Sequence, residues 1–84
     1  MAGDELPAGS SLETAIVILA SEPGEGVREE YLHLARLFGR QLSDWYPVGQ
    51  VPISRDGRTY DQIDVQVGRN VRRVYFDITS FMPE

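Results

Sequence analysis

Hydrophobic and polar residues alternate most regularly between Thr59 and Phe81, and this alternation predicts a β-hairpin. One side of its two arms is apolar: Ile63, Val65 and Val67, then Val74, Phe76 and Ile78. The other side is polar: Tyr60, Gln62, Asp64 and Gln66, then Arg73, Tyr75, Asp77 and Thr79. Because successive side chains of a strand point to opposite faces of a sheet, the apolar set is expected to face a core.

The turn of this hairpin lies near Gly68-Arg69-Asn70. A two-residue turn at Gly68-Arg69 and one at Arg69-Asn70 both pair residues whose numbers add to an odd value. Both registers therefore keep the apolar faces together, whereas a three-residue loop would mix them. We predict one of the two odd registers.

Apolar side chains recur with a helical period between Val27 and Trp45. The stripe consists of Val27, Tyr31, Leu34, Ala35, Phe38, Leu42 and Trp45. This spacing predicts a helix that ends at or before Tyr46, because Pro47 disfavours helical geometry in the residue before it. Gly39 lies inside the stripe and either permits close approach to the sheet or breaks the helix slightly.

Charged residues lie beside this stripe. Glu29 and Glu30 are expected near the helix start, where carboxylates suit the helix dipole. They are also spaced to pair with His33 or Arg36 on the helix surface. The sequence therefore places His33 on a solvated flank.

Two further segments are predicted to be strands. Residues 14–20 are apolar at consecutive positions, which is typical of a strand buried on both faces or central in a sheet. Residues 48–54 alternate but contain Pro52, which cannot donate to a ladder, so this segment is expected at a sheet edge.

The connection from this edge strand to the hairpin contains Asp56-Gly57, a strong turn signal. A two-residue turn would place Val51 and Ile53 on the polar side. A three-residue loop, residues 55–57 with a glycine bulge, would place both on the apolar side. Since burying both side chains gains a few kcal/mol, we predict the three-residue loop.

The order strand, helix, strand, strand, strand predicts an α+β fold. We expect a two-layer sandwich, with one helix packed on a 3–4-stranded, mainly antiparallel sheet. The chain has 84 residues, enough for one domain, which we assign to residues 13–84. Residues 1–12 are rich in Gly, Ala, Ser and Pro and are expected to form a flexible N-terminal tail. The place of the first strand stays open, and a right-handed crossover would allow it to run parallel to a later strand.

Composition narrows the class of protein. The chain has no cysteine and one histidine, and its eight basic residues are all arginine. Lack of cysteine excludes a thiolate zinc finger and favours a cytoplasmic location. The acidic N-terminus does not resemble a signal peptide, and the longest apolar run, residues 15–20, is too short for a membrane span.

Charge is uneven along the chain. Residues 1–30 hold seven acids and one arginine, a net charge of −6, while residues 31–84 hold six acids and seven arginines, a net charge of +1. An acidic leading segment with a nearly neutral body disfavours nucleic-acid binding.

No motif predicts a catalytic centre, a cofactor or a metal. The loop at residues 21–26 joins a strand to a helix, where phosphate loops occur, but Glu22 and Glu25 would repel phosphate. His33 has no nucleophile and acid at a recognisable spacing. We therefore expect no cofactor, and the lack of a motif favours a binding protein over an enzyme.

The polar side of the hairpin supplies the candidate binding residues: Tyr60, Asp64, Arg73, Tyr75 and Asp77. Asp64 and Asp77 share this face, and Arg73 offers a cross-strand partner, so a solvated ladder of ion pairs is the plainest interpretation. Asp61 is expected on the opposite, apolar face.

Aromatic and apolar residues at the ends of the elements supply candidate interface residues: Tyr46, Phe81 and Met82. Such residues are enriched in protein interfaces. Phe81 and Met82 lie beyond the predicted ladder, so they either fold back onto the core or meet another chain.

The segments Tyr60-Asp61 and Val74-Tyr75-Phe76-Asp77-Ile78-Thr79-Ser80-Phe81 resemble a pattern in a family of small uncharacterised bacterial proteins. The similarity covers about the last 25 residues. It implies a bacterial origin and one stand-alone domain, and no activity comes with it.

The function expected from these features is binding, by self-association as a homodimer or through a protein partner. An alternative is a small-ligand or enzymatic role for the polar face of Asp64, Arg73, Tyr75 and Asp77. A weaker alternative is single-stranded nucleic acid on the same face. No membrane association is expected.

Overall fold

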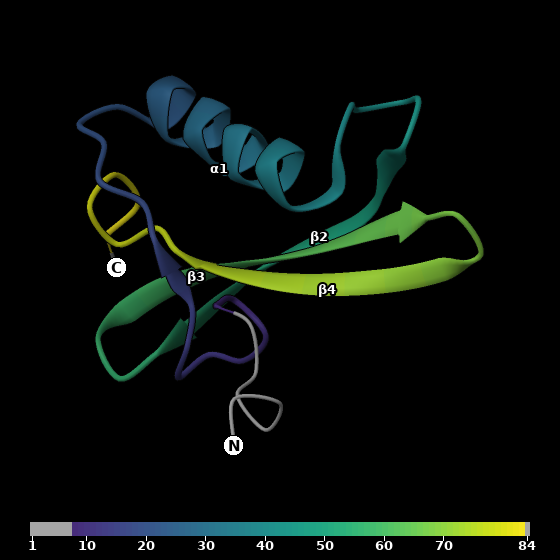
Figure 1. The fold of residues 1–84 in the computed structure, drawn as a ribbon. Coiled ribbons are helices and arrows are strands. Elements are labelled where there is room, and N and C mark those ends of the chain that lie inside the picture. The colour runs from purple at the N-terminus through teal and green to yellow at the C-terminus, as the bar shows by residue number, and fades with distance from the viewer. Residues whose placement is uncertain (1–7, 84) are drawn as a thin grey trace, which may run out of the picture.

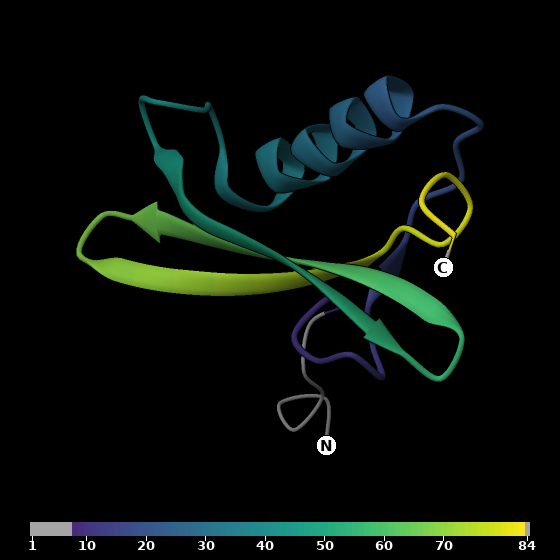
Figure 2. The ribbon, with the colours of Figure 1, turned by 180° about the vertical axis from the view of Figure 1, so that it is seen from behind.

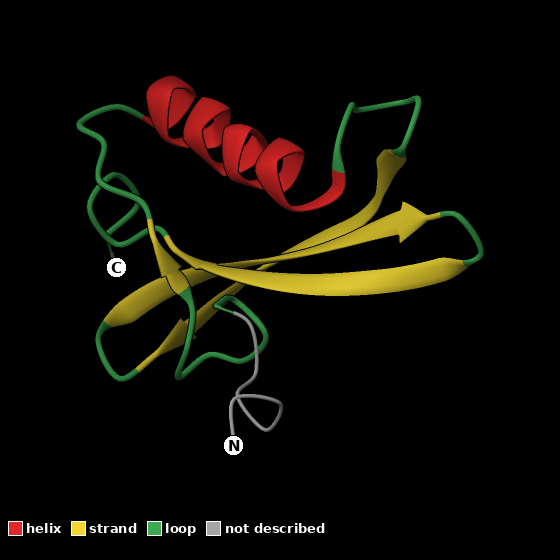
Figure 3. Ribbon diagram, viewed as in Figure 1, coloured by secondary structure: helices red, strands yellow, loops and turns green. Residues whose placement is uncertain are grey.

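The computed structural model describes residues 8–83 (Figure 1). The elements are β1 (Ile16–Val17), α1 (Pro23–Phe38), β2 (Trp45–Arg55), β3 (Arg58–Val67) and β4 (Asn70–Asp77). The four strands form one sheet in the order β1-β4-β3-β2. The helix lies on one face of this sheet, so the fold is an α+β sandwich with a mixed sheet (Figure 3). No helix in the described residues has the length and apolar character needed to cross a membrane.

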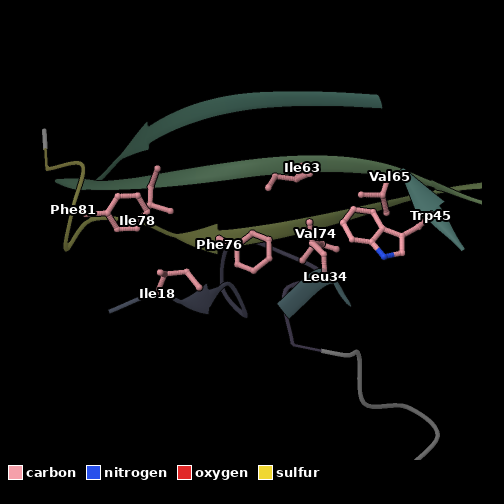
Figure 4. Close-up of a cluster of buried hydrophobic side chains, with 9 residues drawn as sticks. All are labelled: Ile18, Leu34, Trp45, Ile63, Val65, Val74, Phe76, Ile78 and Phe81. Atoms are coloured by element: carbon pink, nitrogen blue, oxygen red, sulfur yellow. The ribbon is translucent and has the colours of Figure 1, made fainter. Parts of the chain in front are cut away.

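The core lies between the helix and the sheet, and its buried apolar side chains come from both layers (Figure 4). They are Ile18, Leu34, Trp45, Ile63, Val65, Val74, Phe76, Ile78 and Phe81. The apolar alternation of β3 and β4 thus faces the helix, as the sequence predicts.

The β3–β4 hairpin turns at Gly68 and Arg69, because Val67 pairs with Asn70. Gly68 has φ 60°, which suits the first central position of a type II′ turn. Ile63 consequently lies opposite Val74. This is one of the two odd registers expected from the alternation, so that prediction is confirmed.

The β2–β3 hairpin turns in two residues, so the predicted three-residue loop is wrong. Arg55 pairs with Arg58, and Asp56 and Gly57 have φ 53° and 78°. Two positive φ values define a type I′ turn, whose twist matches that of the flanking strands. The turn's backbone preference therefore outweighs the burial that the longer loop would have given Val51, which is exposed here.

This register decides which β2 side chains face the helix. Pro52 lies opposite Asp61, so Pro52 and, by alternation, Gln50 lie on the helix side. β2 is an edge strand, as its proline predicts, but it begins earlier, at Trp45, and has an irregularity between Pro47 and Gly49.

The helix ends at Phe38, earlier than the apolar stripe suggests. Gly39 has φ 102°, and its N–H donates to Ala35 O, which is a local way to finish a helix. Trp45 therefore belongs to β2; its Nε1 donates to Gly39 O at 2.7 Å, and its ring lies 6.0 Å from that of Tyr31.

The helix also presents a different side to the sheet. Its buried residues are Gly26, Glu30 and Leu34, while Val27 is exposed. A side chain at Gly26 would overlap the Phe81 ring, so this glycine permits the close approach of helix and C-terminal segment.

The orientation of the helix on the sheet also affects His33. It is half-buried, and its ring lies 6.2 Å from that of Phe76. The flank predicted to be solvated is thus partly covered at His33.

β1 lies at the sheet edge, parallel to β4, with Ile16 opposite Phe76. Val17 and Leu19 are exposed, so the prediction of a central or doubly buried strand is wrong. Ahead of β1, Gly9 is buried and its carbonyl accepts the Tyr75 N–H at 2.7 Å. The part of the expected tail at residues 1–7 lies outside the described residues.

The turn after β4 closes the fold. The Ser80 hydroxyl donates to Ile18 O at 2.7 Å and accepts the Ala20 N–H at 3.1 Å. These contacts fasten the chain that follows β1 to the chain that follows β4 (Figure 2).

Candidate functional site

The structure brings the predicted polar residues together on the sheet face opposite the helix. Asp64 lies opposite Arg73, whose Nε and Nη2 donate to the two carboxylate oxygens at 2.8 and 3.1 Å. The hydrogen bonds from Arg73 lower the pKa of Asp64, and the same contact raises that of Arg73. Since Arg73 is half exposed, such a pair contributes little to stability.

Asp77 also forms an ion pair with an arginine. It is buried and accepts Arg58 Nε at 2.6 Å and the Thr79 hydroxyl at 2.6 Å. Burial would raise the pKa of Asp77, but the hydrogen bonds from Arg58 and Thr79 outweigh it and hold the pKa below its ordinary value.

The two tyrosines of this face, Tyr60 and Tyr75, are half-buried. Tyr60 lies opposite Asp77 across the β3–β4 ladder, and Tyr75 lies opposite Gln62. With both carboxylates engaged by arginines, the face is a ladder of paired charges, and among residues 8–83 it offers no free carboxylate to a ligand.

The predicted interface residues separate in the structure. Tyr46 is 48% exposed, Phe81 is only 7% exposed and belongs to the core, and Met82 is 46% exposed. Phe81 therefore folds back onto the core, one of the two outcomes expected for it, and Met82 lies at the rim of a cavity.

A second constellation, which sequence reasoning missed, lies between the helix and the sheet. Glu30 of α1 is 0% exposed, and neither of its carboxyl oxygens has a hydrogen-bond partner among the described residues. Asp61 of β3 is 5% exposed, and its Oδ2 accepts Gln50 Nε2 at 2.6 Å.

Burial and the neighbouring Asp61 raise the pKa of Glu30 to about 9. Glu30 is therefore protonated at neutral pH, and a protonated carboxyl can donate a hydrogen bond to the Asp61 carboxylate. This explains how two acids lie together in a core without a basic partner. Burial, then the charges of Glu30 and Asp61, also raise the pKa of Tyr31.

These groups line a cavity of about 260 Å³ at the start of the helix. Its polar side consists of Glu30, Gln50 and Asp61, and its apolar side of Pro23, Val27, Pro52, Ile78, Phe81 and Met82. An acidic end and an apolar wall suit a small ligand that carries a positive group on a hydrocarbon stem.

Only part of this site has a signal in the sequence. The odd-numbered alternation of β3 places Asp61 on the apolar face. Gly26, Glu30 and Leu34 follow one another at steps of four residues, which is a helix face, but the glycine lies in a segment read as a turn.

A larger groove of about 580 Å³ lies beside β4 at the other end of the helix. Its lining includes Ala8, Gly9, Ser10, Leu37, Phe38, Val67, Val71, Arg72, Arg73 and Val74. β1 pairs only with Phe76 and Asp77, and Gly9 bonds to Tyr75, so residues 70–74 have no strand partner on this side within residues 8–83.

The backbone of β4 shows which groups this open edge presents. Tyr75 N–H donates to Gly9, and Asp77 O accepts from Ile18, both on the side away from β3. Because backbone groups alternate along a strand, Val71 and Arg73 direct their N–H and C=O groups to the same edge.

Compared with known proteins, the chain matches no family model, no curated protein and no solved structure. The described residues contain no group of three or more metal-binding side chains. The groove beside β4 and the acidic cavity are the two candidate sites of the described residues.

Proposed function

We propose that this chain is a protein-binding module that adds an extended segment of a partner to β4. The observation that carries the proposal is the open edge of residues 70–74 beside the groove. An open strand edge offers unpaired N–H and C=O groups, and a partner strand that pairs with them gains affinity from main-chain hydrogen bonds.

The two edges of the sheet differ in their suitability for strand addition. β2 contains Pro47 and Pro52 and has an irregularity between Pro47 and Gly49. Prolines and bulges protect an edge from pairing. The β4 edge at residues 70–74 contains neither feature, which selects β4 as the binding edge.

The side chains of the groove define the partner's chemistry. Leu37, Phe38 and Val67 supply an apolar lining, which suits one buried apolar side chain of the partner. Arg72 is exposed and forms none of the ion pairs found within residues 8–83. Arg72 lies opposite Val65 and so shares the helix side of the sheet with the groove. A segment that carries an apolar and an acidic residue two positions apart, on one face of the strand, therefore fits this groove best.

A second copy of the chain fits the β4 edge less well. If two β4 strands paired antiparallel about a two-fold axis near Arg72, the two Arg72 side chains would face each other. Like charges directly opposite are destabilising. The proposal is therefore for a different protein partner, and sedimentation at micromolar concentration should show a monomer.

An eight-residue peptide with threonine at every second position, and valine and glutamate taking turns at the positions between, places both side chains on the groove side and tests the proposal. We expect it to shift the backbone amide resonances of Val71 and Arg73 and to slow their hydrogen exchange. The same peptide with lysine in place of glutamate should bind at least several-fold more weakly, because Arg72 would repel it.

Two variants at one position separate backbone pairing from side-chain contact. Val71→Pro removes an N–H at the open edge without removing a donor to β3, so it should abolish peptide binding. Val71→Ala keeps the N–H and is the matched control. Equal binding by both variants, shifts confined to the face of Tyr60 and Tyr75, or no response to the glutamate peptide would overturn the proposal.

A further inference from the structure

We propose that the cavity lined by Glu30, Asp61 and Gln50 is a binding site for an alkylammonium group, with its hydrocarbon stem against the apolar wall. This site lies at the start of the helix, whereas the groove beside β4 lies at its end. The inference does not depend on the proposed function.

The buried carboxyl group of Glu30 supports this proposal. Its side chain lines the cavity and is 0% exposed, and apart from the proton that it can donate to Asp61 its two oxygens have no hydrogen-bond partner among the described residues. A buried polar group without a partner is costly, and a buried charge without one is more so. A cation that displaces the neighbouring side chains and reaches these oxygens would supply a partner.

The hydrogen-bond acceptors of the cavity match the donors of an ammonium group. Asp61 Oδ2 is occupied by Gln50, while Asp61 Oδ1 enters no hydrogen bond found among the described residues. Once the Glu30 proton has left, its two oxygens and Asp61 Oδ1 together offer three acceptors. An ammonium group has three N–H donors and is compact, whereas a guanidinium fork suits a single carboxylate better.

The apolar part of the cavity favours a cation that carries a hydrocarbon stem. Its apolar wall consists of Pro23, Val27, Pro52, Ile78, Phe81 and Met82, and no arginine in the described part of the chain lines it. The apolar wall provides no ligands for a hydrated divalent cation, because calcium and magnesium take six or more oxygen ligands including water. A cation on a hydrocarbon stem fills both parts of the site.

Binding must displace the proton that Glu30 holds. The titratable groups facing it are Asp61 from β3 and Tyr31 from its own helix. Tyr31 stays neutral at pH 6–8, because burial and the neighbouring acids raise its pKa above the ordinary tyrosine value. Between pH 6 and pH 8 one proton should leave for each ammonium bound, so the affinity should rise about tenfold per pH unit.

The test uses n-pentylammonium as a free amine and Nα-acetyl-lysine N-methylamide as a peptide lysine. Calorimetry in two buffers of different ionisation enthalpy measures affinity and proton release at pH 6, 7 and 8. At least one of the two should bind, and their relative affinities tell whether the natural source is a free amine or a lysine side chain.

Neutral n-pentanol controls for simple filling of the apolar cavity. Glu30→Gln and Asp61→Asn should each weaken pentylammonium at least tenfold at pH 8, while Glu29→Gln, a neighbour on the same helix, should leave it unchanged. Thermal unfolding of each variant checks that the fold is retained.

The proposal is overturned if neither amine binds or if pentanol binds as well as pentylammonium. It is also overturned if Glu30→Gln and Glu29→Gln bind alike or if calcium chloride competes at equal concentration. Pentylammonium affinity that does not change between pH 6 and pH 8 would exclude the exchange of proton for cation.

Discussion

At the scale of single residues, the unusual feature of this protein is an acid that occupies a core position. Glu30 faces the sheet between Gly26 and Leu34 on the buried side of the helix. An apolar residue there would avoid the cost of burying a carboxyl group. Its presence beside Asp61 couples the stability of the fold to pH.

We predict that the free energy of unfolding falls as pH rises from about 5 to about 9. The folded protein keeps the Glu30 proton up to a pKa of about 9, whereas the unfolded chain releases it near 4.5. In this window the folded state binds one more proton, so stability declines by at most about 1.4 kcal/mol per pH unit. Urea unfolding at pH 5, 6.5 and 8 measures this slope.

Glu30→Gln should flatten the profile and make the protein more stable than the parent at pH 8. Glu29→Gln keeps the buried proton and should retain the parent slope. Asp64 and Asp77, with lowered pKa values, act in the opposite sense and lose stabilisation only as pH falls towards and below about 4. Equal parent stability at pH 5 and pH 8 would contradict the assignment.

At the scale of elements, the predictions of the β2–β3 turn and of the helix end were wrong, because local backbone conformation determines both. The alternation of β3 and β4 gave the correct register, because only odd pairings keep Ile63 and Val74 together. The prediction of the β2–β3 turn gave most weight to the burial of Val51, although Asp56 and Gly57 both suit positive φ. There the local turn preference decides the register.

The helix shows a second limit of sequence reasoning. Its end at Gly39 is a local feature that the periodicity of Leu42 and Trp45 concealed. The burial of Glu30 depends on Asp61, which is distant in the sequence, and no spacing rule connects two such acids. The polar face was predictable because its contacts are cross-strand neighbours, and the acidic cavity was not, because it depends on how the helix is rotated.

We predict that Gly57→Ala destabilises the protein by about 1–2 kcal/mol. Gly57 has φ 78°, and a new Cβ would contact nothing within 4 Å, so the cost comes from the backbone alone. Gly24→Ala is the control, because its Cβ also meets open space but lies in the helix. It should stabilise by up to about 1 kcal/mol. Chemical denaturation of both variants compares the two signs.

At the scale of the whole molecule, the core depends on residues beyond the last strand. Phe81 is buried against Gly26 and joins the core cluster. A chain of this size has a total stability of about 4–13 kcal/mol. One large side chain at the end of the fold therefore carries a sizeable share of it.

We predict that Phe81→Ala costs about 3–5 kcal/mol, the usual loss for a buried phenylalanine. Met82→Ala should cost less than about 1 kcal/mol, because Met82 is half exposed. Thermal and urea unfolding of the two variants provide the comparison. Similar losses for both would show that Phe81 lies outside the core in solution.

The contacts of Ser80 and Phe81 with residues 18–26 also set a condition on when the protein can fold. During synthesis the helix leaves the ribosome long before these partners do. Until residue 81 has emerged, the start of the helix has no ring against Gly26, and the chain after β1 is not fastened. Such long-range closure delays folding, so the packing of the helix start becomes possible only after residue 81 has emerged.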